Sequence, residues 1–113
     1  MSAWIDREIE LPAELIADGQ SYPLKSLSVT FRDQAELGVD DMRLYTHSDS
    51  PIPATSKTLL LALPGRGILL TVLAEECAAK LSPPGEHLHL TVPDQSHRGI
   101  IASLVRSGEA RQA

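Results

Sequence analysis

The stretch that decides the fold is residues 58–81, which read TLLLALPGRGILLTVLAEECAAKL. Its first six residues form an uninterrupted apolar run, as expected of a strand that is covered on both faces. Residues 64–67 (Pro-Gly-Arg-Gly) break this run, and the apolar side chains from Ile68 to Leu81 fit the spacing of one helix face. The pattern therefore predicts a strand, a turn and a helix. The competing prediction is a hairpin with Ile68–Leu73 as its second arm.

The residues after this stretch predict a second strand and a second helix. Residues 83–85 (Pro-Pro-Gly) end the first helix, and residues 87–92 alternate polar and apolar side chains as a strand does. Pro93 ends that strand, and Ser96 is a suitable N-cap for a helix that continues to Val105. The first three of these elements would form a right-handed parallel crossover.

The N-terminal half has the alternation of antiparallel strands. Side chains alternate between apolar and polar at residues 27–32 and 42–47, and less regularly at residues 5–11. Residues 12–19 begin with Pro and end with Gly, which predicts a short helix. The fold class that we expect is α+β, with a mixed sheet of about five strands that has an antiparallel N-terminal part and a C-terminal strand-helix-strand-helix unit.

The chain length predicts one domain over residues 1–113, because neither half alone could bury an adequate core. Small polar residues and two prolines near residues 48–57 predict a mobile loop. We expect the tail at residues 107–113 to be disordered. Seventeen leucines stand beside four aromatic residues, so the core should be aliphatic.

Charge disfavours direct binding to nucleic acid. The net charge is −5, and residues 1–50 hold ten acidic groups against four basic ones. Phosphate contacts require clustered Lys and Arg, and base stacking requires several exposed rings. We therefore expect a protein partner, for which a basic surface would be complementary, and a homodimer is a further option.

The remaining composition predicts a cytoplasmic protein that does not associate with membranes. Charged residues 6–10 interrupt any N-terminal leader, and no uncharged apolar run approaches the roughly 20 residues that span a bilayer. Cys77 is the single cysteine, which excludes an internal disulfide, and its acidic neighbours Glu75 and Glu76 would raise the pKa of its thiol. We expect no cofactor and no metal site.

The turn at residues 64–67 is the first candidate ligand site. Gly65 and Gly67 would let backbone N–H groups approach an anion at a helix N-terminus, and Arg66 could reinforce the contact. The alternative is a tight turn that needs a positive φ. Residues 60–67, 73–76 and 92–94 resemble the opening of a carboxylesterase-type α/β-hydrolase, in which the Gly-rich turn helps to build an oxyanion hole. The chain has Pro64 where that family usually has His, and it has no Gly-x-Ser-x-Gly motif.

His87 and His89 are the second candidate. They lie two residues apart on a predicted strand, so both rings should point to one face, where they could bind a metal with His47, His97, Asp49 or Glu86. Residues 89–91 also resemble one of the two His-x-Thr motifs of the 2H phosphoesterases. The alternative is the polar face of a half-exposed strand, and it explains the alternation fully.

No catalytic constellation is complete, so we favour a non-enzymatic accessory or regulatory protein that binds another protein as an adaptor, chaperone or inhibitor. The predicted interface residues are Trp4, Glu8, Glu10, Asp40 and Asp41, because Trp is common at interface hot spots and the acidic residues would form a charged rim. The alternative function is the binding or hydrolysis of a small molecule or phosphate ester by Gly65, Arg66, Gly67, His87 and His89.

Overall fold

One antiparallel sheet makes up most of the described chain. The computed structural model describes residues 3–34, 38–49, 52, 58–74, 87–107 and 110–112. Its strands are β1 (Ala3–Ile9), β2 (Glu14–Ala17), β3 (Gln20–Pro23), β4 (Ser26–Gln34), β5 (Gly38–His47), β6 (Thr58–Leu63), β7 (Ile68–Ala74), β8 (His87–Thr91) and β9 (Ala110–Gln112). A 3-10 turn, η1 (Pro64–Arg66), joins β6 to β7, and helix α2 (Gln95–Arg106) follows β8. The strand order is β3-β2-β6-β7-β8-β5-β4-β1-β9, and all neighbouring strands are antiparallel.

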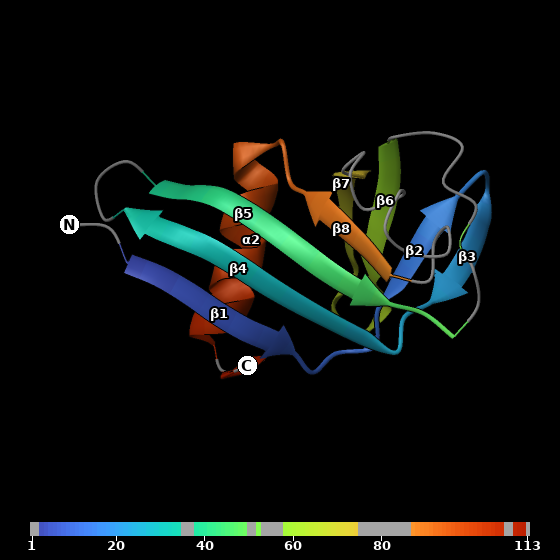
Figure 1. Cartoon of the computed structure of the whole chain (residues 1–113), viewed down its shortest axis with the longest axis horizontal. Helices are drawn as coiled ribbons and strands as arrows, with labels where there is room; N and C mark the ends of the chain where they lie inside the picture. The colour runs from blue at the N-terminus through green and yellow to red at the C-terminus, as the bar shows by residue number, and fades with distance from the viewer. Residues whose placement is uncertain are drawn as a thin grey trace.

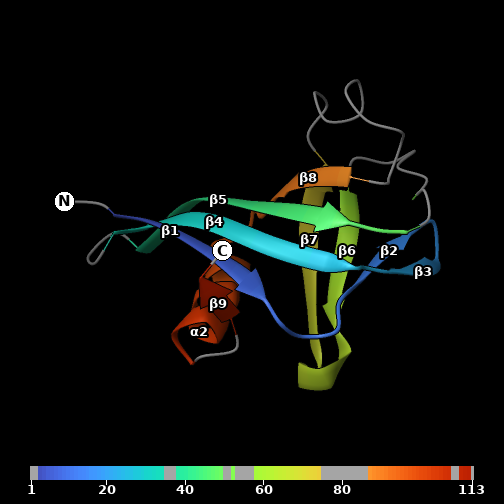
Figure 2. The same cartoon turned by 60° about the horizontal axis from the view of Figure 1, so that its bottom comes forward.

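The sheet bends sharply between its two halves. Strands β1, β4 and β5 form a broad layer, and helix α2 packs beneath it (Figures 1 and 2). Strands β6 and β7 stand at a steep angle to this layer (Figure 2). The core fills the space that the broad layer, the β6–β7 wall and α2 enclose.

The core is aliphatic, as predicted, and the alternating segments supply much of it. Leu27, Val29 and Phe31 of β4 are at most 1% exposed, while the residues between them are half-buried on the opposite face. Met42 and Leu44 of β5 are buried in the same way. The strands predicted around residues 5–11, 27–32, 42–47 and 87–92 are therefore confirmed, as is the helix predicted over residues 96–105.

The predicted helix after the Pro-Gly-Arg-Gly turn is wrong for residues 68–74, which form β7 and pair with β6 as a hairpin. An apolar run fits a helical period and a strand period equally well, so the spacing alone could not decide. Leu70 and Val72 point into the core, whereas Leu69 is 55% exposed. Residues 75–81 of the predicted helix, with Cys77, lie outside the described residues.

The predicted short helix at residues 12–19 is also wrong, because this segment forms β2 and the turn into β3. Asp18 and Gly19 both have positive φ (51° and 79°), as the two central residues of a type I′ turn require, and Ala17 pairs with Gln20 across it. An Asp-Gly pair is a strong signal for a hairpin turn. Here it outweighs the helix that Pro12 and Gly19, at the two ends of the segment, predicted.

These two corrections overturn the predicted fold class. The described chain has no parallel crossover and no strand-helix-strand-helix unit, since β7 pairs antiparallel with both β6 and β8. Residues 110–112, within the tail expected to be disordered, form β9 along one edge of the sheet.

Helix α2 is fastened to the sheet through its first turn. Its N-cap is Asp94 rather than the predicted Ser96: the Asp94 carboxylate accepts hydrogen bonds from the backbone N–H groups of Ser96 and His97, and these bonds lower the pKa of Asp94. Arg98 reaches back to the strands. Its guanidinium donates to the carbonyl oxygen of Val39 (3.0 Å) and to those of the two residues that follow β8, Val92 (2.9 Å) and Pro93 (3.0 Å).

We predict that Gly19→Ala destabilises the fold. No atom would contact the added Cβ, so the cost comes from the positive φ and should be about 1–2 kcal/mol of unfolding free energy in urea denaturation. Gly65→Ala is the matched control, because its Cβ also meets open space and its φ is not positive. Equal stabilities for the two variants would contradict the type I′ turn.

We also predict that Arg98→Met destabilises the protein, because three carbonyl oxygens lose a charged donor. Hydrogen bonds to charged groups are worth about 1.5–3 kcal/mol, so the free energy of unfolding should fall by roughly that amount. Arg106→Met, in the last turn of α2, is the control and should cost less than about 1 kcal/mol. An Arg98 variant as stable as the Arg106 variant would show that α2 does not depend on these contacts.

Candidate functional site

The broad layer leaves one side uncovered by α2, and we call the described residues on that side the outer face. Cross-strand partners share a face, so the register arranges them in rows. The rows are Trp4–Arg32–Asp40, Asp6–Thr30–Arg43–Thr91 and Glu8–Ser28–Tyr45–His89. Asp41, next to Asp40, reaches the first row through its side chain. The outer face is thus polar except for the exposed aromatic rings of Trp4 and Tyr45.

Trp4 is the most exposed large apolar side chain in the described chain, at 58%. The guanidinium carbon of Arg32 lies 5.8 Å from the centroid of its ring, within the range of a cation–π contact. Trp4 and Arg32 are direct cross-strand partners on β1 and β4. The indole is therefore held at the surface by a neighbouring strand while much of its area stays in water.

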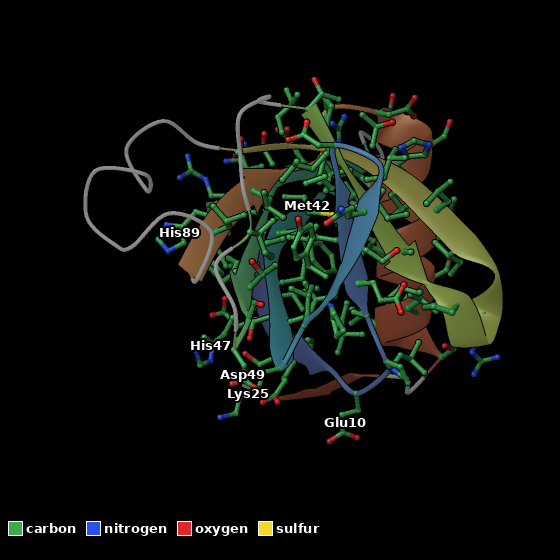
Figure 3. The ribbon with its side chains drawn as sticks, turned by 90° about the vertical axis from the view of Figure 1, so that its right-hand side faces the viewer. Glu10, Lys25, Met42, His47, Asp49 and His89 are labelled. Carbon is green, nitrogen blue, oxygen red and sulfur yellow. The ribbon has the colours of Figure 1, made fainter. Side chains whose placement is uncertain are left out.

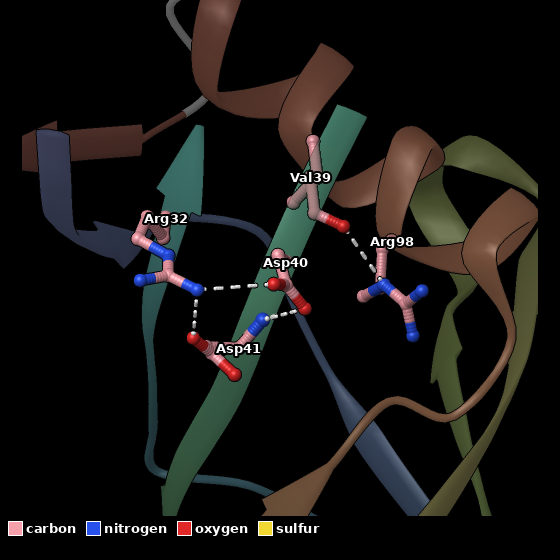
Figure 4. A network of polar contacts seen from close by, with 5 residues as sticks. All are labelled: Arg32, Val39, Asp40, Asp41 and Arg98. Atoms are coloured by element: carbon pink, nitrogen blue, oxygen red, sulfur yellow. Dashed lines mark hydrogen bonds and ion pairs between the residues drawn. The ribbon is translucent and has the colours of Figure 1, made fainter. Parts of the chain in front are cut away.

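A bulge in β5 brings two carboxylates onto the same arginine. The register shifts between Thr30 and Arg32, and Asp41 takes a positive φ of 49°. Nη2 of Arg32 then lies 3.1 Å from Oδ2 of Asp40 and 2.8 Å from Oδ2 of Asp41 (Figure 4). Arg32 is the residue that joins the indole to both acids.

The pKa of Asp40 is lowered in this arrangement. The main cause is the backbone N–H of Asp41, which donates to Oδ1 of Asp40 at 2.8 Å, and the Arg32 side chain adds to it. Because the folded-state pKa lies below the unfolded one, ionised Asp40 favours the fold at neutral pH, and this contribution is lost as the pH falls through the folded-state pKa. The network is therefore intact at neutral pH.

Glu8 and Glu10 lie at the opposite end of β1 from Trp4. Together with Lys25 they line a cavity of about 320 Å³ between the β1–β2 and β3–β4 connections. Lys25 also pairs with Asp49 at 3.7 Å, and Figure 3 shows Glu10, Lys25 and Asp49 along one rim of the molecule. The structure thus brings together three predicted interface residues, Trp4, Asp40 and Asp41. Glu8 lies two rows away on the outer face, and Glu10 lies beyond the end of β1.

The second predicted site is not assembled. Gly65, Arg66 and Gly67 form the exposed tip of the β6–β7 hairpin, at the far end of these strands from β8 (Figure 2). No helix follows the turn, and the N–H of Gly67 donates to the carbonyl of Pro64 at 3.2 Å. His89 is exposed on the outer face, edge-on to the Tyr45 ring at 4.8 Å between centroids. The side chain of His87 and all of Glu86 lie outside the described residues.

Among the described residues, no three His, Cys, Asp or Glu side chains could together hold a metal ion, and no helix has the length and apolarity to cross a membrane. No family model matches the chain, and no curated protein and no solved structure is significantly similar to it.

Sequence reasoning missed Arg32 as a site residue. Its position in the alternation of residues 27–32 placed it on the polar face of a strand, but the register between β1, β4 and β5 was needed to put it between Trp4 and Asp40. Arg32 is one of four basic residues in the acidic half of the chain, and this was the one available signal.

We predict that Arg32→Gln raises the pKa of Asp40 part of the way to its ordinary value. The Asp41 N–H contact remains, so the restoration should be incomplete. An NMR titration of the side-chain carboxyl carbons measures this directly. Asp94 is the internal control, since its pKa is lowered by backbone N–H groups of α2 and should not change. An unchanged Asp40 titration would mean that Arg32 does not contact this carboxylate in solution.

Proposed function

We propose that this protein is a small binding module that docks a basic protein partner on its outer face, with Trp4 as the central anchor. The observation that carries the proposal is the exposed indole of Trp4, positioned over Arg32, which is in turn held by Asp40 and Asp41. An adaptor or an inhibitor of a larger assembly would work in this way.

The arrangement suits an anchor because it reduces the entropy lost on binding. Tryptophan is enriched at hot spots, and an interface side chain that is already ordered loses less rotamer freedom when the partner arrives. Two strands position the pair: β1 presents the indole, and β4 presents the guanidinium directly opposite. The carboxylates on β5 fix the guanidinium from the other side.

Charge supports a basic partner. The outer face of β1, β4 and β5 carries four carboxylates (Asp6, Glu8, Asp40 and Asp41) against two guanidinium groups (Arg32 and Arg43). A complementary basic surface would associate faster at low ionic strength, and its affinity would fall as salt rises.

We predict that Trp4→Ala removes the partner. Tagged wild-type and variant proteins are incubated with a lysate of the cells that make the protein, and the bound proteins are quantified by mass spectrometry. Loss of a hot-spot side chain costs about 2 kcal/mol or more, so recovery of the partner should fall by at least about tenfold.

Leu69→Ala is the matched control, because Leu69 is 55% exposed but lies on β7, near the η1 turn and outside the outer face. It should retain the partner that Trp4→Ala loses, and higher salt should weaken the retained complex. Equal recovery with wild type and Trp4→Ala would refute the proposal.

A further inference from the structure

Strands β1 and β4 separate beyond their last paired residues, and a cavity lies where they part. The ladder between the two strands ends at Glu8↔Ser28, after which each chain leads into a connection. The cavity of about 320 Å³ between the β1–β2 and β3–β4 connections is lined by residues 8–13 and 24–27. All of these lining residues belong to the described part of the chain.

Two backbone hydrogen bonds hold the walls of the cavity in place. The N–H of Leu24 donates to the carbonyl oxygen of Ala13 at 2.9 Å, which ties the two connections to each other. The N–H of Lys25 donates to the carbonyl oxygen of His47 at 2.7 Å, which ties the β3–β4 connection to the end of β5. The cavity is therefore formed in the free protein, and a ligand that enters it need not order its walls.

The lining of the cavity combines aliphatic residues with an excess of carboxylates. Five of the lining residues belong to the core or pack against it: Ile9, Leu11, Ala13, Leu24 and Leu27. The charged residues of the lining are Glu8, Glu10 and Lys25. Lys25 also pairs with Asp49 at 3.7 Å, so these four residues place three carboxylates against one ammonium. A cation at the end of an aliphatic stem complements both the aliphatic lining and the negative charge.

We propose that this cavity receives an arginine side chain of the protein partner. The inference rests on the proposed function, because it gives the partner a second point of contact besides Trp4. A guanidinium group can pair with more than one carboxylate at once, which suits a lining that holds both Glu8 and Glu10. Trp4 and Glu8 are four residues apart on β1, so the arginine should lie about 13 Å from the residue that packs on the indole.

The first test titrates the full chain with n-butylguanidinium, which carries the stem and the head group of an arginine side chain. In NMR spectra of the ¹⁵N-labelled protein, the amide signals of Leu11 and Leu24 should shift and reach saturation, because both residues line the cavity. The guanidinium ion and 1-butanol each carry one half of this probe. At the same concentrations, each should give smaller shifts at these two amides.

The second test compares two acidic residues that lie four positions apart in the chain. Glu10→Gln removes a carboxylate from an exposed position beyond the end of β1, and it should weaken the binding of n-butylguanidinium about threefold. In the lysate experiment, recovery of the partner should fall by at least the same factor. Glu14→Gln is the matched control, because Glu14 does not line the cavity, and it should equal wild type in both assays.

The inference would be overturned by shifts that do not saturate, by equal shifts with the guanidinium ion or 1-butanol, or by equal results for Glu10→Gln and Glu14→Gln in either assay. The Trp4→Ala variant separates this failure from failure of the proposed function. If Trp4→Ala loses the partner and Glu10→Gln retains it, the outer face binds the partner without the cavity, and only the present inference falls. If Trp4→Ala retains the partner, both proposals fall.

Discussion

The pairing of β8 with two different strands is the constraint on which the rest of the structure depends. Among the described residues, which stop at Ala74 and resume at His87, β8 pairs with β5 at five positions and with β7 at two, Leu73↔Thr91 and Ala74↔Leu90. Pro93 lacks a backbone N–H and cannot extend the ladder, so β7 continues without β8 and the sheet bends there. The first turn of α2 occupies the space this opens. Nδ1 of His97 accepts a hydrogen bond from the N–H of Thr71 at 3.3 Å, and Arg98 donates to the carbonyl oxygens of Val92 and Pro93, which follow β8.

This junction explains why α2 covers one side of the broad layer and not the other. With α2 fixed at its N-terminus, Ile101, Ala102 and Leu104 become part of the core beneath β1, β4 and β5. No described element covers the opposite side of these strands. The position of the candidate site is therefore a consequence of how the sheet bends.

The strands that could be predicted from the sequence are those with one buried face and one solvent-exposed face. Alternation in β4 and β5 follows directly from burial on one side only, and it specifies both the strand and the direction of its side chains. The β6–β7 hairpin lacks this signal because Leu60, Ala62, Leu69 and Leu73 are apolar although they are not fully buried. The spacing of its apolar residues fits both a helix and a strand, and only the antiparallel pairing of β7 with β6 and β8 shows that it is a strand. The β2–β3 hairpin is different, since its turn residues Asp18-Gly19 are a local signal for a hairpin. The same Gly19, taken with Pro12 at the other end of the segment, was interpreted as the end of a short helix.

The candidate site was predictable in its residue types but not in its assembly. Trp4, Asp40 and Asp41 drew attention as an aromatic residue and an acidic pair, yet they lie on strands that are not adjacent, and Arg32 on β4 connects them. The bulge at Asp41 is also a property of the paired strands.

The energetics of the network argue for a role other than stability. Exposed ion pairs contribute at most about 1 kcal/mol, and the Arg32, Asp40 and Asp41 side chains are each about a third to a half exposed. An indole that is 58% exposed gains little from burial in the free protein. Three strands nevertheless order these side chains into one arrangement. This order contributes little to folding, but it would favour the binding of a partner that covers the same side chains. Their rotamers are already restricted, so less conformational entropy would be lost on binding.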